Sequence, residues 1–169
     1  SYGYLKGTYA RDKDSVVAVM LITEMAAYYK AKNMTLYDAM EALYERYGYY
    51  KEATVNVVMK GLDGLEKMAA LMEGIRKEPP KELGGRKVVA MRDYLTEKIT
   101  NIETGEVTPT GLPKSNVLYF ETTGGNVVVI RPSGTEPKVK IYLLVNGDCA
   151  QSAEKTMEEF RNSISGWTK

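Results

Sequence analysis

Two strongly apolar segments, 127–130 and 139–145, enclose the stretch Arg131-Pro132-Ser133-Gly134-Thr135-Glu136-Pro137-Lys138. Valine, isoleucine, leucine and tyrosine dominate both segments, which is typical of strands. The connection between them is short and contains proline and glycine, as hairpin connections do. This strand-turn-strand pattern constrains the fold more than any other feature, because it requires a β-sheet.

The 131–138 loop also carries the groups of an anion site. It combines the Arg131 guanidinium, the hydroxyls of Ser133 and Thr135 and the Lys138 ammonium, while Gly134 lets backbone N–H groups point in one direction. Such a set suits a phosphate. The same composition is typical of an ordinary turn. The residues alone therefore leave two interpretations open, a phosphate cup and a plain hairpin connection.

The rest of the chain indicates an α+β protein. Apolar residues at helical spacing predict helices at about 15–32, 35–47, 62–75 and 150–164. Alternating or β-branched runs predict strands at about 53–60, 87–91, 117–120, 127–130 and 138–145. The polar stretch 104–113 has the composition of an exposed loop. The order after Gly48 is β-α-β-β-β-β-α, which predicts an antiparallel sheet of four to five strands with two helices on one face.

Residues 1–47 contain only a loop and two predicted helices. The first helix follows the N-cap candidate Asp14 and is apolar over most of its circumference, so we expect it to be buried on several sides. Thr35 and Asp38 form a variant of the capping box at the second helix. We therefore expect residues 1–47 to be the tail of a neighbouring domain whose sheet is missing, and residues 48–169 to be a separate C-terminal domain.

Composition excludes several kinds of site. The formal net charge is +1, which gives no case for a nucleic-acid surface or an anionic membrane. The chain has no histidine and one cysteine, which argues against zinc and haem sites and is compatible with a reducing cytoplasm. The apolar stretch 16–29 is interrupted by Thr23 and Glu24 and is too short to span a bilayer. We expect a cytoplasmic protein without nucleic-acid or membrane partners.

Three stretches carry a resemblance to a known family. The 131–138 loop resembles the phosphate-binding loop of the C-terminal domain in α-D-phosphohexomutases, the phosphoglucomutase/phosphomannomutase superfamily. Ser1-Tyr2-Gly3-Tyr4 is similar to the end of that family's sugar-binding loop, and Arg11-Asp12-Lys13-Asp14 stands where its members carry a basic residue before a buried helix. The resemblance implies the tail of the third domain followed by the fourth domain, whose fold is like that of the TATA-box-binding protein.

The resemblance also implies a division of labour over four domains. A phosphoserine in the first transfers its phosphoryl group, Mg²⁺ in the second assists, the third grips the sugar, and the fourth holds the phosphate that does not react. Glucose 1,6-bisphosphate is the intermediate, which turns over and rebinds between the two phosphoryl transfers. This sequence has neither a Thr-Ala-Ser-His-Asn-Pro-like serine loop nor an Asp-Gly-Asp-Ala-Asp-like metal loop. We expect no catalytic residue and no metal site in the chain, which would be inactive without the missing upstream domains.

Carried over residue by residue, the resemblance implies two sets of contacts. The substrate phosphate would be bound by Arg131, Ser133, Gly134, Thr135 and Lys138. The sugar would be bound by Ser1 and Lys13. The Ser-Tyr-Gly ending favours a phosphoglucomutase, an isomerase of carbohydrate metabolism that interconverts glucose 1-phosphate and glucose 6-phosphate, with phosphomannomutase and phosphopentomutase activity left open. The competing hypothesis is a stand-alone, non-catalytic binding or protein-interaction module of the same fold.

Overall fold

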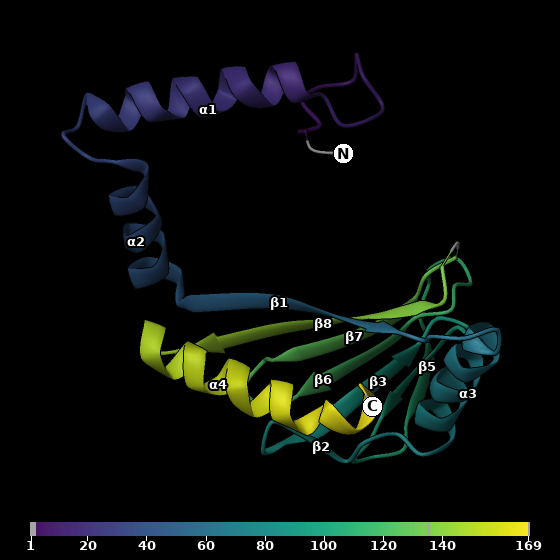
Figure 1. Ribbon diagram of the computed structural model, residues 1–169. Helices are drawn as coiled ribbons and strands as arrows, with labels where there is room; N and C mark the ends of the chain where they lie inside the picture. Colours follow the sequence, from purple (N-terminus) through teal and green to yellow (C-terminus); the bar gives the residue numbers. More distant parts are fainter. Residues whose placement is uncertain (1–2, 135, 169) are drawn as a thin grey trace. The chain divides into compact units, whose positions relative to one another are not determined.

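The computed structural model describes residues 3–134 and 136–168 and divides the chain into two compact units, Ser1–Tyr47 and Gly48–Lys169 (Figure 1). The first unit contains the helices α1 (Ser15–Lys30) and α2 (Leu36–Tyr47). The second unit contains the sheet and the remaining helices. That the first unit is the tail of a further domain stays a prediction.

Both helix starts predicted in the first unit are confirmed. The Asp14 carboxylate caps α1 by accepting hydrogen bonds from the backbone N–H groups of Val16, at 2.8 Å, and Val17, at 3.2 Å. Ahead of α2, the Thr35 backbone N–H donates to the Asp38 carboxylate at 2.7 Å, and the Asp38 N–H donates to the Thr35 hydroxyl at 3.1 Å. This reciprocal pair is a capping box, which satisfies N–H groups that the first helical turn leaves without partners.

The expected burial of α1 is wrong for this chain. None of its residues is buried, and Val16, Val19 and Met20 remain between 65% and 69% exposed. A helix that is apolar on several sides needs a surface to pack against. Within the described residues of the first unit, α2 is the only helix available, and it contacts α1 sparsely. The apolar surface of α1 is therefore left uncovered.

The second unit is an eight-stranded antiparallel sheet with the order β1-β8-β7-β6-β3-β4-β5, and β2 pairs with β3. The strands are β1 (Tyr49–Val58), β2 (Glu82–Leu83), β3 (Arg86–Asp93), β4 (Lys98–Asn101), β5 (Val107–Pro109), β6 (Leu118–Thr122), β7 (Val127–Pro132) and β8 (Lys138–Gly147). The helices are α3 (Gly64–Lys77), α4 (Ala150–Ser163) and the 3₁₀ helix η1 (Ser165–Trp167). The predicted α+β class with an antiparallel sheet is confirmed.

The sheet has more strands than expected, because short polar strands extend it. Residues 107–109 lie in the stretch predicted to be a loop, yet they form β5, which pairs with β4. All three residues of β5 are exposed, so no apolar alternation marks this strand in the sequence. Its pairing rests on backbone hydrogen bonds, and β5 can include Pro109 because an edge strand leaves some of its backbone groups unpaired.

The core lies between one face of the sheet and the helices α3 and α4. Val139, Ile141 and Leu143 of β8 are fully buried there, together with Met72 of α3 and Phe160 of α4. Alternate residues of the same strand, among them Lys140 and Tyr142, point to the opposite face. We call that opposite face the open face, because neither α3 nor α4 lies on it.

The tight turn between β2 and β3 places α4 against the sheet. Gly84 has φ +57°, and a Cβ atom added there would lie 2.2 Å from the Phe160 ring. The neighbouring Gly85 also has a left-handed conformation, with φ +71°, but an added Cβ would meet nothing within 4 Å. Phe160 therefore packs directly on the backbone of the turn, and only a glycine at 84 leaves room for it.

We predict that Gly84→Ala lowers the free energy of unfolding by about 3 kcal/mol or more, because backbone strain adds to a steric clash in the core. Gly85→Ala is the matched control and should cost only about 1 kcal/mol, from the left-handed backbone alone. Urea unfolding followed by fluorescence of Trp167, the single tryptophan, which packs against the core, measures both. Equal losses in the two variants would contradict the close contact with Phe160.

Candidate functional site

The 131–138 loop connects β7 to β8 and is held at its base by the sheet. Arg131 and Pro132 pair with Lys140 and Val139, and the Ser133 backbone N–H donates to the Lys138 carbonyl at 2.8 Å. The predicted strand-turn-strand is therefore present. Because β7 and β8 are interior strands, each paired on both sides, the loop extends from a firmly held part of the sheet.

The beginning of α3 lies against the same loop. The Met59 backbone N–H donates to the Pro137 carbonyl at 2.8 Å. A Cβ atom added at Gly64 would lie 2.5 Å from the Met59 carbonyl oxygen and 2.9 Å from the Pro137 Cβ, so only glycine fits at this contact. The first turn of a helix carries partial positive charge. This packing therefore adds a favourable dipole beside the loop.

The exposed side chain of Arg131 has no hydrogen-bond or ion-pair partner among the residues that the structure describes. It belongs to the open face, because it alternates with the buried Ile130. Directly opposite it on β8 lies Lys140, which likewise makes no ion pair within the described chain. Opposed residues of neighbouring strands place their Cβ atoms about 5 Å apart, and like charges there repel each other. An anion bound between them would relieve that repulsion.

Lys140 is a candidate that the sequence prediction missed. It lies outside the loop and within a strand, where a lysine alternating with apolar residues suggests only a solvent-facing position. The signal was present in the hairpin register, because an antiparallel pairing that joins Pro132 to Val139 also joins Arg131 to Lys140. On its other side Lys140 faces Asn56 of β1, which adds an amide to the same row of the open face.

Lys138 is less available than Arg131. Its ammonium forms an ion pair with the Glu136 carboxylate within the loop. The hydrogen bond and charge of Lys138, with a smaller contribution from Lys140, lower the pKa of Glu136 below its ordinary value, so the carboxylate keeps its charge at neutral pH. An incoming anion would have to compete with this carboxylate for Lys138.

The structure says less about the other predicted site residues. Ser133 is half-buried, and Gly134 is exposed with open space where a Cβ would stand, so no neighbour forces a glycine at 134. Lys13 is in the first unit and pairs with Asp12 at 2.6 Å. Ser1 and Thr135 lie outside the described residues.

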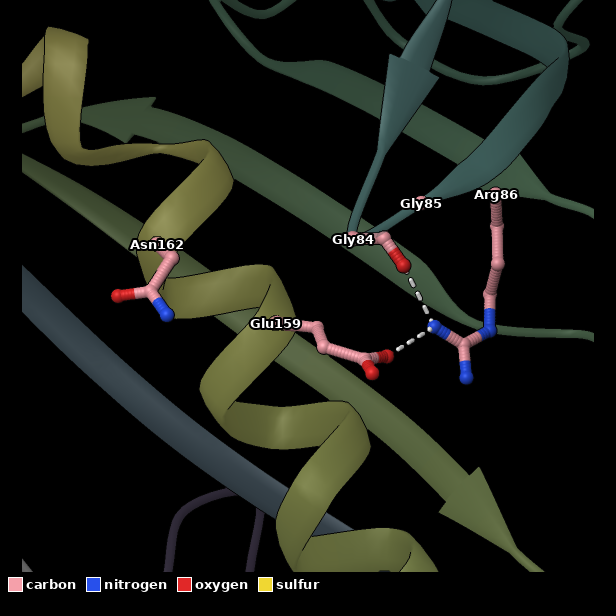
Figure 2. Close-up of a pocket in the computed structure, with 5 residues that line it drawn as sticks. All are labelled: Gly84, Gly85, Arg86, Glu159 and Asn162. Atoms are coloured by element: carbon pink, nitrogen blue, oxygen red, sulfur yellow. Dashed lines mark hydrogen bonds and ion pairs between the residues drawn. The ribbon is translucent and has the colours of Figure 1, made fainter.

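A hollow of about 530 Å³ lies between the β2–β3 turn and α4 (Figure 2). Its cation, Arg86, already donates to the Gly84 carbonyl at 2.6 Å, to Glu159 at 2.9 Å and to the Thr156 hydroxyl at 3.0 Å. Figure 2 shows the guanidinium held between the turn and the helix. Arg86 therefore ties α4 to the turn, and its charge is balanced by Glu159, which makes this hollow a weaker anion site than the 131–138 loop.

Metal-binding clusters and membrane-spanning helices are both absent from the described residues. No group of three or more His, Cys, Asp or Glu side chains in residues 3–134 and 136–168 could hold a metal ion. Among the helices in those ranges, none has the length and apolar character needed to cross a bilayer. The candidate site is the 131–138 loop, and the described residues place no metal-binding cluster beside it.

Comparison with protein families matches residues 55–163 to the model described as phosphoglucomutase/phosphomannomutase, C-terminal domain. A phosphoglucomutase of Staphylococcus aureus (strain bovine RF122 / ET3-1) is 38% identical over 143 residues, which are 85% of this chain and 26% of that protein. A phosphoglucomutase of Staphylococcus haemolyticus (strain JCSC1435) is 35% identical over the whole chain, which is 30% of its length. The chain therefore spans less than a third of these curated relatives.

Among solved structures, the open form of pp63/parafusin, a phosphoglucomutase from Paramecium, is similar in fold. The TM-score is 0.58 at 18% sequence identity, and the match covers 94% of this chain and 27% of that one. At this identity the likeness supports the fold alone.

The ion pair inside the loop gives a direct test of its geometry. We predict that Lys138→Gln raises the pKa of Glu136 towards the ordinary glutamate value, because the cation that lowers it is removed. The exposed Lys114 offers the control Lys114→Gln, which should leave that pKa unchanged. A carbon-13 NMR titration of the Glu136 carboxyl carbon measures both. An unchanged pKa in Lys138→Gln would show that the two side chains do not pair in solution.

Proposed function

Because this chain belongs to the phosphoglucomutase/phosphomannomutase family, whose C-terminal domain it carries, we propose that it is the C-terminal part of a phosphoglucomutase and holds the non-reacting phosphate of a hexose phosphate. The observation that carries this proposal is the opposed pair Arg131 and Lys140, two cations at the base of one loop, neither of which forms an ion pair in the described residues. Such a pair is stabilised by an anion bound between its members.

The roles of the side chains follow from their positions. Arg131 offers a planar guanidinium that can donate two parallel hydrogen bonds to phosphate oxygens, and Lys140 adds a second charge from the neighbouring strand. Lys138 exchanges the Glu136 carboxylate for the phosphate. The hydroxyl donors Ser133 and Thr135 are assigned by the family resemblance of the loop alone. Loop backbone N–H groups can add further donors, as at other phosphate sites.

The chemistry itself is assigned to the longer protein. The sequence has no counterpart of the family's serine loop or metal loop, and the described residues present no carboxylate cluster that fits Mg²⁺. We therefore propose that this chain contributes no catalytic residue and is inactive alone. The longer protein would interconvert glucose 1-phosphate and glucose 6-phosphate in the cytoplasm, with Mg²⁺ and glucose 1,6-bisphosphate bound through its upstream domains.

The uncovered surface of α1 supports the existence of those upstream domains. Val16, Val19 and Met20 are exposed on a helix whose sequence is apolar enough for a core. The matched relatives extend over more than three times the aligned length, which leaves ample chain to cover it. We propose that α1 packs on the upstream part of the third domain, where Ser1 and Lys13 would contribute to sugar binding.

The binding role predicts a weak but specific interaction. We expect this chain to bind glucose 1-phosphate with a dissociation constant near the millimolar level, about 4 kcal/mol, because a few charge-assisted hydrogen bonds must offset the cost of immobilising the ligand. Arg131→Ala should weaken binding at least tenfold. NMR titration of the backbone amides measures both values, with the amides of the 131–138 loop expected to shift.

Arg161→Ala is the control for a lost positive charge, since Arg161 is exposed in the last turn of α4 and makes no ion pair in the described chain. It should bind as the unsubstituted chain does. Loop amides that stay unmoved at saturating ligand would refute the phosphate-binding role and favour the stand-alone interaction module. A micromolar affinity would instead refute the idea that the upstream domains supply most of the binding energy.

Removal of the Glu136 carboxylate should increase the affinity for the phosphate ligand, whereas removal of Arg131 should decrease it. Glu136→Gln should strengthen glucose 1-phosphate binding about threefold or more, because it removes a negative charge beside the site and releases Lys138. Glu103→Gln, an exposed position in the β4–β5 connection, controls for the change in net charge and should have little effect. Weaker binding in Glu136→Gln would mean that Glu136 positions Lys138 for the ligand rather than competing with it.

A further inference from the structure

A row of aromatic side chains lies beside Arg131 on the open face. Val129 stands two residues before Arg131 on β7 and points to the same face. On one side of Val129 the paired residue is Tyr142 of β8, and on the other side it is Tyr119 of β6. We call these three residues, Tyr142, Val129 and Tyr119, the tyrosine row. It adjoins the Arg131–Lys140 pair, because Val129 is two residues from Arg131 on β7 and Tyr142 is two residues from Lys140 on β8.

The tyrosine row is only partly covered by the rest of the domain. All three side chains are half-buried, and α3 and α4 pack on the other face of the sheet. Tyr119 is held in place by Arg92, whose guanidinium lies 5.0 Å from the ring centroid and pairs with Glu121. Burial, followed by the charge of Glu121, raises the pKa of Tyr119, so its hydroxyl stays protonated at neutral pH. One tyrosine ring is thus oriented, and its hydroxyl can donate a hydrogen bond.

The dimensions of the row match a sugar ring attached to a phosphate. Residues two apart on a strand are about 6.7 Å apart, so a group joined to a phosphate at Arg131 lies above Val129. The flanking strands place Tyr142 and Tyr119 about 9 to 10 Å apart, with the smaller valine between them. A pyranose ring has apolar C–H faces and a rim of hydroxyls. Aromatic rings that end in hydroxyl groups complement both features.

We propose that the tyrosine row contacts the sugar ring of the hexose phosphate whose phosphate is held by the 131–138 loop. This inference rests on the proposed function, and it adds that the C-terminal domain recognises the ring as well as the phosphate. Arg131 and Lys140 orient the ligand by its charge, and the row then distinguishes a cyclic sugar from an acyclic phosphate ester. The domain would thereby contribute to specificity independently of Ser1 and Lys13.

The test compares two phosphate monoesters on this 169-residue chain, glucose 1-phosphate and glycerol 3-phosphate, which lacks a ring. In an NMR titration we expect both to shift the amides of the 131–138 loop, and glucose 1-phosphate alone to shift the side-chain signals of Tyr119 and Tyr142. Tyr142→Ala should weaken glucose 1-phosphate binding about three- to tenfold and leave glycerol 3-phosphate binding unchanged.

Tyr50→Ala is the matched control, because Tyr50 is an exposed tyrosine on β1 that lies outside the row. It should change neither affinity. Tyr142→Phe keeps the ring and tests the hydroxyl alone, which also guards against misfolding of the alanine variant. If the tyrosine signals stay still while the loop amides shift, or if Tyr142→Ala and Tyr142→Phe both bind the two esters as the unsubstituted chain does, the inference is overturned. If neither ester shifts the loop, the proposed function itself fails.

Discussion

The antiparallel register between β7 and β8 is the constraint on which the rest of the second unit depends. It joins Ile130 to Ile141 on the core face and Arg131 to Lys140 on the open face. Because side chains alternate, a slip of one residue in either strand would move its apolar set out of the core and its cations into it. The core and the candidate anion site are therefore specified by the same pairing, and neither can change without the other.

The same pairing explains why a site arises where two strands end. A sheet edge or turn leaves backbone N–H groups free, and here the register adds two opposed cations to them. Within the loop, Glu136 neutralises Lys138 but leaves Arg131 without a carboxylate partner among the described residues. The start of α3, held against Pro137 through Gly64, contributes a favourable dipole. The concentration of positive charge is thus local, and it is compatible with a chain whose net charge is only +1.

The two units illustrate different relations between apolar sequence and burial. In the second unit, most apolar residues of β8, α3 and α4 bury one another in the core. In the first unit, a helix that is more apolar than α3 or α4 has no buried residue. Burial is a property of the partner surface as much as of the helix: the apolar pattern of α1 predicted burial, and no described part of this chain provides the surface that would bury it. Family membership and the short share of each relative that is covered agree with this interpretation.

The sequence by itself determined the features that depend on local patterns. These are the helix starts at Asp14 and Thr35, the strands with clear apolar alternation, the α+β class, and the hairpin connection at 131–138, because propensity, capping and alternation act between residues close in the chain. The tertiary structure alone decided the rest. Strand β5 has no apolar signal in the sequence. Lys140 becomes a candidate only because it pairs with Arg131, and Tyr119 and Tyr142 come into one row only because β6 and β8 both pair with β7. Each of these depends on which backbones pair, and that choice is made by burial and hydrogen bonding over the whole sheet.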